Sequence, residues 1–370
     1  QNRAVICCIS QCVGKLISKG IKPDFVFAAD PQNLISHFEK VNGDNVGALV
    51  LAATVNPKLY KVPASRFITM AANGQSDEWL LAFLGQQPNT SAGGSVACSV
   101  FALSAQAKCH PIILVGQDLA FSGNRMYAQG AAKTDLTLQL SDDGQNWISV
   151  GEVEQSLNDE IPLEQEKPKF SKLLQLPGYY GGTVKTNESF KIFWNWFAKS
   201  ATNLKDELLF LNCTEGGAFI PGMEHIPLKE AAEKYLHDEI DKESLHLEVY
   251  KDFDREKSIT EGLYKLEEAL SGLERCSEIT KDATLLLDGQ DPNKLEKLDL
   301  LESELMEEVK KARFISIFKP QEIREALKEL THVDTVEESF IASKKLYAII
   351  NDCHKTMEQP LKNAIAILKE

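Results

Sequence analysis

Short apolar runs without polar alternation recur through the first 228 residues and constrain the fold more than any other feature. Strands that are apolar on both faces are typical of parallel sheets covered by helices. Helical patterns separate these runs, and parallel strands joined in this way are connected by right-handed crossovers. The sequence therefore predicts an α/β fold with a doubly wound, mostly parallel, Rossmann-like sheet. The expected strands are 3–9, 24–29, 48–53, 66–70, 111–115 and 207–212, and the expected helices are 33–42, 77–85, 95–108 and 188–203.

Residues 133–186 interrupt this succession. KTDLTLQL and NWISVGEVE have the pattern of two strands, and the turn SDDGQ lies between them. The acidic, proline-bearing stretch SLNDEIPLEQEKPKF follows. We expect a β-hairpin insertion and then a loop, which serves either as a lid or acceptor-binding rim or as an insertion without a role in binding.

The distribution of charge and glycine divides the chain near residue 228. Residues 1–228 hold 18 Lys/Arg and 21 Asp/Glu, a net charge of −3, whereas residues 229–370 hold 22 and 33, a net charge of −11. Nineteen of the 22 glycines lie in the first part. The second part carries apolar residues at spacings of three and four, as amphipathic helices do. We therefore predict a Rossmann-like domain at 1–228 and an all-α helical bundle of four to six helices at 229–370.

Charge and composition also exclude several classes of protein. A net charge of −14 argues against binding to nucleic acid or to an anionic membrane through the general field of the protein. No run of about 18 uncharged apolar residues predicts a membrane span, and no signal peptide is recognised. Eight cysteines without a CxxC pair indicate small buried side chains in a reducing cytoplasm, and no metal site is predicted.

Polar or glycine-rich residues follow the ends of several expected strands. Ligands of open parallel sheets bind beyond the carboxyl ends of the strands. Asp30 follows 24–29, residues 116–118 (Gly-Gln-Asp) follow 111–115, and Thr214 begins a glycine-rich segment after 207–212. Each one alone is compatible with an ordinary turn. Together they predict a binding site at this edge, with Asp118 in the crevice where the strand order reverses.

A second candidate feature is the start of the expected helix at 95–108. Gly93 and Gly94 permit close backbone approach, and the free N–H groups of a helix N-terminus attract an anion. Ser95 either caps the helix, contacts a phosphate, or does both. Stronger motifs are absent: the sequence has no GxxxxGK[ST], GxGxxG or HExxH, and the near match to GxSxG lacks the strand that should precede it.

Five segments together resemble a known family. They are IKPDFVFAADPQ, GGSVACSVFALSAQAKCHPIILVGQDLAF, YAQG, LPGYYGGTVKTNESFKIFWNWF and LNCTEGGAFIPG, in this order. The chain resembles the bacterial motility accessory factor family of flagellin glycosyltransferases, whose central domain groups with archaeal hydroxymethylpterin pyrophosphokinases. It is also similar to bacterial sialyltransferases. The resemblance spans about residues 1–228, and its most specific parts are GGSVA with GQDLAF, and TEGGA.

This resemblance implies the cytoplasmic transfer of a nonulosonic acid, such as pseudaminic or legionaminic acid, from a CMP-sugar donor to Ser or Thr of flagellin. No cofactor beyond the donor is implied. Asp118 and His225 are the two candidates for the base that accepts the proton of the acceptor hydroxyl. The residues implied in donor binding are Asp30, Gly93, Gly94, Ser95, Gly116, Gln117, Tyr127, Thr214, Glu215, Gly216 and Gly217.

One departure from the family keeps alternatives open. The family's first strand ends in a Gly-Pro-Ser segment that contacts the nucleotide, and this chain begins at the second strand, so we expect one wall of the pocket to be missing. The first alternative is a pterin pyrophosphokinase-like enzyme that transfers diphosphate from ATP and uses Asp30 and Asp118 as Mg²⁺ ligands. The second is a non-catalytic flagellar assembly factor, whose helical bundle binds flagellin or a chaperone. A homo-oligomer formed through the helical bundle is a further expectation for this chain.

Overall fold

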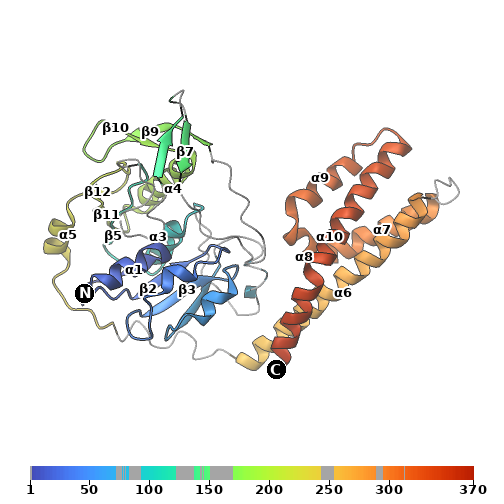
Figure 1. Cartoon of the computed structure of the whole chain (residues 1–370), viewed down its shortest axis with the longest axis horizontal. Coiled ribbons are helices and arrows are strands. Elements are labelled where there is room, and N and C mark those ends of the chain that lie inside the picture. The colour runs from blue at the N-terminus through green and yellow to red at the C-terminus, as the bar shows by residue number, and fades with distance from the viewer. Residues whose placement is uncertain are drawn as a thin grey trace. The chain divides into compact units, whose positions relative to one another are not determined.

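The computed structural model shows an α/β unit followed by an all-α unit, as the sequence predicts (Figure 1). It describes residues 2–71, 77, 79, 81–82, 93–121, 137–141, 144, 146–150, 170–242, 254–288, 295–311 and 313–370. Among the described residues, one compact unit holds those up to 242 except Ala82, and the other holds Ala82 and residues 254–370, whereas the expected domains were 1–228 and 229–370. Helix α5 (Leu228–Tyr235) therefore belongs to the α/β unit, where Ala231 packs against Leu211 and Cys213.

Four parallel strands in sequential order form the first sheet. They are β1 (Cys7–Ile9), β2 (Phe25–Ala28), β3 (Ala48–Ala52) and β4 (Phe67–Met70). Every residue of β3 is buried, which explains why its sequence shows no polar alternation. The intervening segments are helix α1 (Ser10–Ser18) and the 3-10 helices η1 (Ile35–Phe38) and η2 (Pro57–Lys61). Hence only one turn of 3-10 helix forms where a helix was expected at 33–42.

A second parallel sheet follows, with the strand order β12-β11-β5. Its members are β5 (Ile112–Leu114), β11 (Phe210–Asn212) and β12 (Glu224–His225). Helix α3 (Val96–Gln106) packs against β1 and β2 of the first sheet and against β5 of the second. The fold class is thus as expected, although hydrogen bonds in the described part of the chain divide the parallel strands into two sheets.

An aromatic cluster forms the core beside the second sheet. Helix α4 (Glu188–Leu204) contributes Trp196 and Phe197, and their rings lie 5.6 and 5.5 Å from that of Phe101 on α3. The ring of Phe210 on β11 stacks on Phe101 at 4.9 Å. Because these packed rings join α3, α4 and β11, they fix the positions of the loops that begin or end these elements.

Two antiparallel sheets occupy the region of the expected insertion. The β6 (Thr137–Leu140) and β7 (Asn146–Val150) pair is the expected hairpin, and β8 (Phe170–Lys172) adds a third strand to it. The other sheet is the hairpin of β9 (Leu174–Pro177) and β10 (Thr183–Thr186). The stretch from 151 to 169 lies outside the described residues, so the expectation of a loop is left open there.

Two 34-residue helices form the framework of the second unit. They are α6 (Arg255–Asp288) and α10 (Val336–Lys369), which pack along each other. Helix α7 (Leu295–Lys311) packs on α6, and α9 (Pro320–Leu330) packs on α10, with α8 (Arg313–Phe318) between them in sequence. Leu266, Ala269, Leu273, Cys276 and Ala283 recur at spacings of three, four and seven, and all are buried. No described helix combines the length and the apolar character that a membrane span requires.

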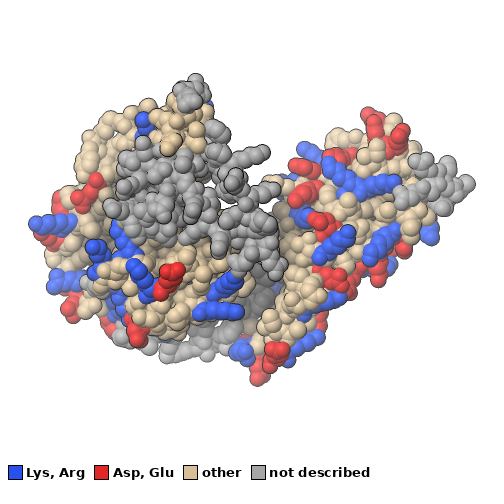
Figure 2. All heavy atoms as spheres, viewed as in Figure 1, with Lys and Arg blue, Asp and Glu red and all other residues tan. Residues whose placement is uncertain are grey.

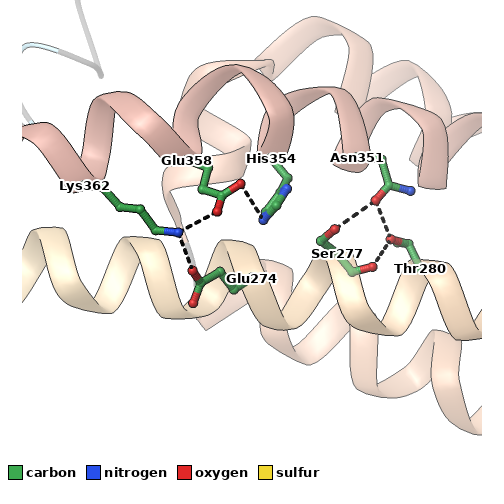
Figure 3. Close-up of polar contacts among 7 residues, drawn as sticks. All are labelled: Glu274, Ser277, Thr280, Asn351, His354, Glu358 and Lys362. Atoms are coloured by element: carbon green, nitrogen blue, oxygen red, sulfur yellow. Dashed lines mark hydrogen bonds and ion pairs between the residues drawn. The ribbon is translucent and has the colours of Figure 1, made fainter.

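Polar side chains also lie between α6 and α10 (Figure 3). The Oδ1 atom of Asn351 accepts hydrogen bonds from Ser277 and Thr280, both at 3.1 Å. Farther along the same pair of helices, Lys362 pairs with Glu358 at 2.6 Å and with Glu274 at 3.6 Å. Acidic and basic side chains are interspersed over the visible face of this unit (Figure 2).

Candidate functional site

Two loops meet at the carboxyl ends of β5 and β11. The strands are parallel neighbours, with Leu114 opposite Asn212, so the segments that follow them emerge side by side. The N–H of Gln117 donates to Oγ1 of Thr214 at 3.0 Å, and the N–H of Ala218 donates to the carbonyl oxygen of Asp118 at 2.8 Å. The structure therefore brings together the expected site segments 116–118 and 214–217, which are about a hundred residues apart in the sequence.

Close backbone approach explains the glycine at position 217. A Cβ atom there would lie 2.3 Å from the carbonyl oxygen of Asp118, and the residue has a φ of +67°. Both facts require glycine. Its neighbour Gly216 differs, because a Cβ atom on it would meet nothing within 4 Å.

Backbone strain marks both loops. Leu119 has a φ of +51° and Glu215 a φ of +57°, conformations that cost free energy for residues with a side chain. The first is held by the Thr186 hydroxyl, which donates to the Leu119 carbonyl oxygen at 2.8 Å. The N–H of Phe121 donates to the carbonyl oxygen of Lys185 at 2.9 Å, so strand β10 holds the segment after β5 in place. Strained backbone that the surrounding structure holds in place is common at functional sites.

Asp118 has the environment expected of a proton acceptor. It is partly buried, and this burial raises the pKa of its carboxyl group. A base is most effective when its pKa lies near the working pH, so the shift brings this carboxylate closer to that condition.

The side chain of Glu215 is directed to helix α5. Its Oε1 atom accepts the N–H of Leu228, the first residue of α5, at 2.9 Å. A carboxylate at a helix N-terminus is favourable, because the unpaired N–H groups there carry partial positive charge. Glu215 thus contributes its backbone to the last loop, as expected, while its carboxylate holds α5.

His225 has both ring nitrogens in hydrogen bonds. Nε2 accepts the N–H of Ile220 at 3.0 Å, and Nδ1 lies 3.1 Å from the carbonyl oxygen of Met223, to which it donates. The ring stacks on Phe219 at 4.2 Å, and burial lowers the pKa of the imidazole. In this geometry His225 has no free lone pair for a substrate proton, so Asp118 is the better placed of the two candidate bases.

Ser95 caps helix α3. Its Oγ atom accepts the N–H of Ala97 at 3.3 Å, which is the capping role left open by the sequence. Gly93 lies against Cys98 and Trp196, where a Cβ atom would lie within 2.7 Å of both side chains. The described contacts do not join these residues to the loops after β5 and β11.

The remaining predicted site residues have no described contact with Asp118, are exposed glycines, or fall outside the described residues. Asp30 is exposed and follows β2 at the carboxyl end of the first sheet, and no described contact joins it to Asp118. Gly94 and Gly116 are exposed, and both have positive φ angles. Tyr127 lies outside the described residues. Within the described part of the chain, no group of three or more His, Cys, Asp or Glu side chains is arranged to hold a metal ion.

Sequence reasoning missed two features of this site. The Nδ2 atom of Asn212, at the end of β11, is buried and has no hydrogen-bond partner among the described residues. Such atoms in native proteins call for an explanation, such as an ordered water. The second feature is Tyr180, whose hydroxyl donates to the carbonyl oxygen of Glu215 at 3.2 Å. The only sequence signal for it was the unusual turn LPGYYGG.

Together the fold and the paired loops define an α/β protein with a candidate ligand site at the carboxyl ends of parallel strands. Residues 1–124, about a third of the chain, match the sequence model of the MptE-like family, described as 6-hydroxymethylpterin diphosphokinase MptE-like. This match confirms the resemblance of that segment, which includes β1 to β5 and Asp118.

The chain is also similar to a solved structure, that of the Maf glycosyltransferase from Magnetospirillum magneticum AMB-1. The two share 14% sequence identity at a TM-score of 0.49. The alignment covers 99% of this chain and 49% of the other, so this chain spans about half the length of that protein. A comparison with curated proteins gave no match.

Proposed function

We propose that this chain transfers a nonulosonic acid from a CMP-sugar to Ser or Thr hydroxyls of flagellin in the cytoplasm, in support of flagellar assembly and motility. One observation carries the proposal. GQDLAF and TEGGA, two of the most specific parts of the resemblance, meet through the hydrogen bonds of Gln117 with Thr214 and of Ala218 with Asp118. Their meeting point is the edge at which parallel sheets bind ligands.

The proposed reaction needs one base and one site for a phosphate. The acceptor hydroxyl oxygen attacks the anomeric carbon, and the bond from that carbon to the phosphate oxygen breaks. CMP leaves with the bonding electrons, and the Asp118 carboxylate takes the hydroxyl proton. Because CMP is a good leaving group, positioning of the reactants and stabilisation of its charge supply most of the rate.

The helical unit supports a macromolecular acceptor. Its surface carries interspersed charges, and its exposed apolar side chains include Leu285, Leu300 and Ile341. Surfaces of this composition suit a protein partner, which in this proposal is flagellin, and they also suit a second copy of the chain.

The family match favours a second candidate function. Residues 1–124 match a family described by a pterin diphosphokinase, so the same loops are candidates for a diphosphate transfer from ATP. In that reaction Asp30 and Asp118 would hold Mg²⁺, which would offset the charge of the phosphates.

Calorimetry on this chain with CMP, ATP and AMP distinguishes glycosyl transfer from diphosphate transfer. Binding of CMP in preference to the adenine nucleotides supports glycosyl transfer, whereas Mg²⁺-dependent binding of ATP supports the second candidate. The direct test incubates the chain with a CMP-nonulosonic acid and flagellin and follows the mass of flagellin. An unchanged flagellin mass together with an absence of nucleotide binding would overturn both and favour a non-catalytic assembly role.

A further inference from the structure

Tyr180 presents an aromatic ring to solvent at the tip of a turn. Tyr179 and Tyr180 are the two central residues of the turn from Gly178 to Gly181, which the N–H of Gly181 closes by donating to the Gly178 carbonyl oxygen at 3.0 Å. These positions usually hold small or polar residues. Tyr180 is nevertheless 78% exposed. A large ring left in water contributes little to folding, which leaves its presence here unexplained by stability.

This exposed ring is held in place. Its hydroxyl donates to the carbonyl oxygen of Glu215 at 3.2 Å, and the ring of Tyr179 contacts it edge-on, with centroids 4.8 Å apart. Tyr179 is itself anchored, because its hydroxyl lies 3.1 Å from the carbonyl oxygen of Asn212 and 3.2 Å from that of Ile226. A ring fixed in this way loses little conformational entropy when a ligand binds.

The turn is joined to the candidate site. The N–H of Tyr179 donates to the carbonyl oxygen of Gly217 at 2.9 Å, and Gly178 forms a bridge with Ala218. Gly217 in turn lies against the backbone of Asp118. The turn and the Tyr180 hydroxyl therefore contact the loop that, together with residues 116–118, forms the candidate site.

We propose that the Tyr180 ring is a stacking platform for the planar nitrogen heterocycle of the ligand bound at these loops. The inference rests on the proposed function, in which the heterocycle is the cytosine of the donor. A pterin, the heterocycle of the second candidate function, has the same planar chemistry. Stacking of a base on an aromatic side chain changes affinity by about 5-fold to about 150-fold when the ring is removed.

The test compares ligands with and without a heterocycle. Calorimetry measures the affinity of the chain for CMP, for 6-hydroxymethylpterin and for ribose 5-phosphate, which lacks a base. We expect Tyr180→Ala to weaken binding of the heterocyclic ligand by about 10-fold or more and to leave ribose 5-phosphate unaffected. Tyr180→Phe keeps the ring and should retain most of the affinity. Tyr264→Ala, which removes a tyrosine that is 66% exposed on α6, is the matched control.

The outcomes distinguish this inference from the proposed function. If the wild-type chain binds CMP and Tyr180→Ala binds it equally well, the platform is refuted and the donor site stands. Equal losses for CMP and ribose 5-phosphate would also refute it, because the ring would then act by holding the loop. Binding of the pterin alone, with dependence on Tyr180, would refute glycosyl transfer and support the platform. A wild-type chain that binds neither heterocycle would refute both.

Discussion

Gly217 lies against the backbone of Asp118 so closely that the two loops of the candidate site form one structure. The carbonyl oxygen of Asp118 accepts the N–H of Ala218 at 2.8 Å, and a Cβ atom on Gly217 would lie 2.3 Å from that same oxygen. The position of the Asp118 carboxylate therefore depends on a residue about a hundred positions away in the sequence.

Alanine at the two adjacent glycines should have opposite consequences. Gly217→Ala combines a steric clash with a left-handed φ, which by itself costs about 1–2 kcal/mol, so we expect a lower melting temperature and loss of CMP binding. Gly216→Ala places a methyl group in open space, so the melting temperature and CMP binding should change little. Thermal unfolding and calorimetry on both variants check this. Equal behaviour of the two would contradict the close packing described here.

Asp118→Asn should slow transfer strongly without weakening the fold. The amide keeps the shape of the side chain but accepts no proton, so we expect the transfer rate to fall by about 10²-fold or more. Asp44→Asn, at an exposed carboxylate in the same unit, is the control and should transfer at the wild-type rate. Mass spectrometry of flagellin over time gives both rates. Transfer by Asp118→Asn at the wild-type rate would remove this residue from the mechanism.

The pH dependence of the same variant provides a second measurement. Burial raises the folded-state pKa of Asp118, so the folded protein binds this proton more tightly than the unfolded chain does. Above the folded-state pKa, the ionised group therefore lowers the free energy of unfolding, and Asp118→Asn should be at least as stable as the wild type at neutral pH. The difference should vanish as the pH falls below the ordinary pKa of an aspartate. A variant less stable than the wild type at neutral pH would contradict the cause given for the shift.

The sequence predicted correctly those features of the fold that depend on the pattern of a single strand or helix. The uniformly apolar run 48–53 predicts a buried parallel strand, and β3 is that strand. Polar residues after the strands at 111–115 and 207–212 predict neighbouring loops, because carboxyl ends of parallel strands share an edge. Hydrophobic periodicity could not show which side chains form hydrogen bonds within the folded loops. His225 was one of the two candidate bases, but its hydrogen bonds to residues 220 and 223 depend on a turn that the pattern does not specify.

Contacts between distant segments were also beyond the sequence. Charge counting placed the domain boundary at 228, because Leu228 begins a charged helix of ordinary amphipathic pattern. Its attachment to the α/β unit depends on the bond of its N–H to Glu215 and on the burial of Ala231. In the same way, the position of the Tyr180 ring beside the candidate site depends on the hydrogen bond of its hydroxyl to Glu215, a partner 35 residues away.

His225 should act as a structural residue, and its replacement should affect stability more than chemistry. His225→Ala leaves the N–H of Ile220 without its acceptor, a loss of about 1–3 kcal/mol in the free energy of unfolding. His225→Gln provides both an acceptor and a donor and should lose less. Chemical denaturation of both variants measures these losses. Wild-type stability of His225→Ala together with loss of transfer would instead assign it a catalytic role.

The same histidine should make the wild type sensitive to mild acid. Burial lowers its folded-state pKa, so the unfolded chain takes up the proton first as the pH falls below about 6.5. The contribution of His225 is fully present above that value and is lost as the pH falls toward the folded-state pKa. The stability of the wild type should therefore decline more steeply between pH 7 and pH 5 than that of His225→Gln. Parallel curves would contradict this assignment.

Asn351 should be the most sensitive polar position of the helical unit. It accepts hydrogen bonds from Ser277 and Thr280, which are almost fully buried between α6 and α10 (Figure 3). Asn351→Ala removes the acceptor and leaves Ser277 without the hydrogen bond described here, whereas Thr280 can still donate to the Ser277 carbonyl oxygen at 2.9 Å. We expect the unit to lose about 1–3 kcal/mol in its free energy of unfolding.

A control for this substitution lies on the same helix. Asn363 is exposed on α10 and accepts a hydrogen bond from Gln359 at 2.8 Å, so Asn363→Ala removes an equivalent amide from a position in contact with water. Because water replaces that bond, we expect a change of about 0.5 kcal/mol or less. Urea unfolding of the full chain, followed by far-ultraviolet circular dichroism, compares the two variants. Equal losses would show that the Asn351 bonds contribute no more than a surface contact to the packing of α6 against α10.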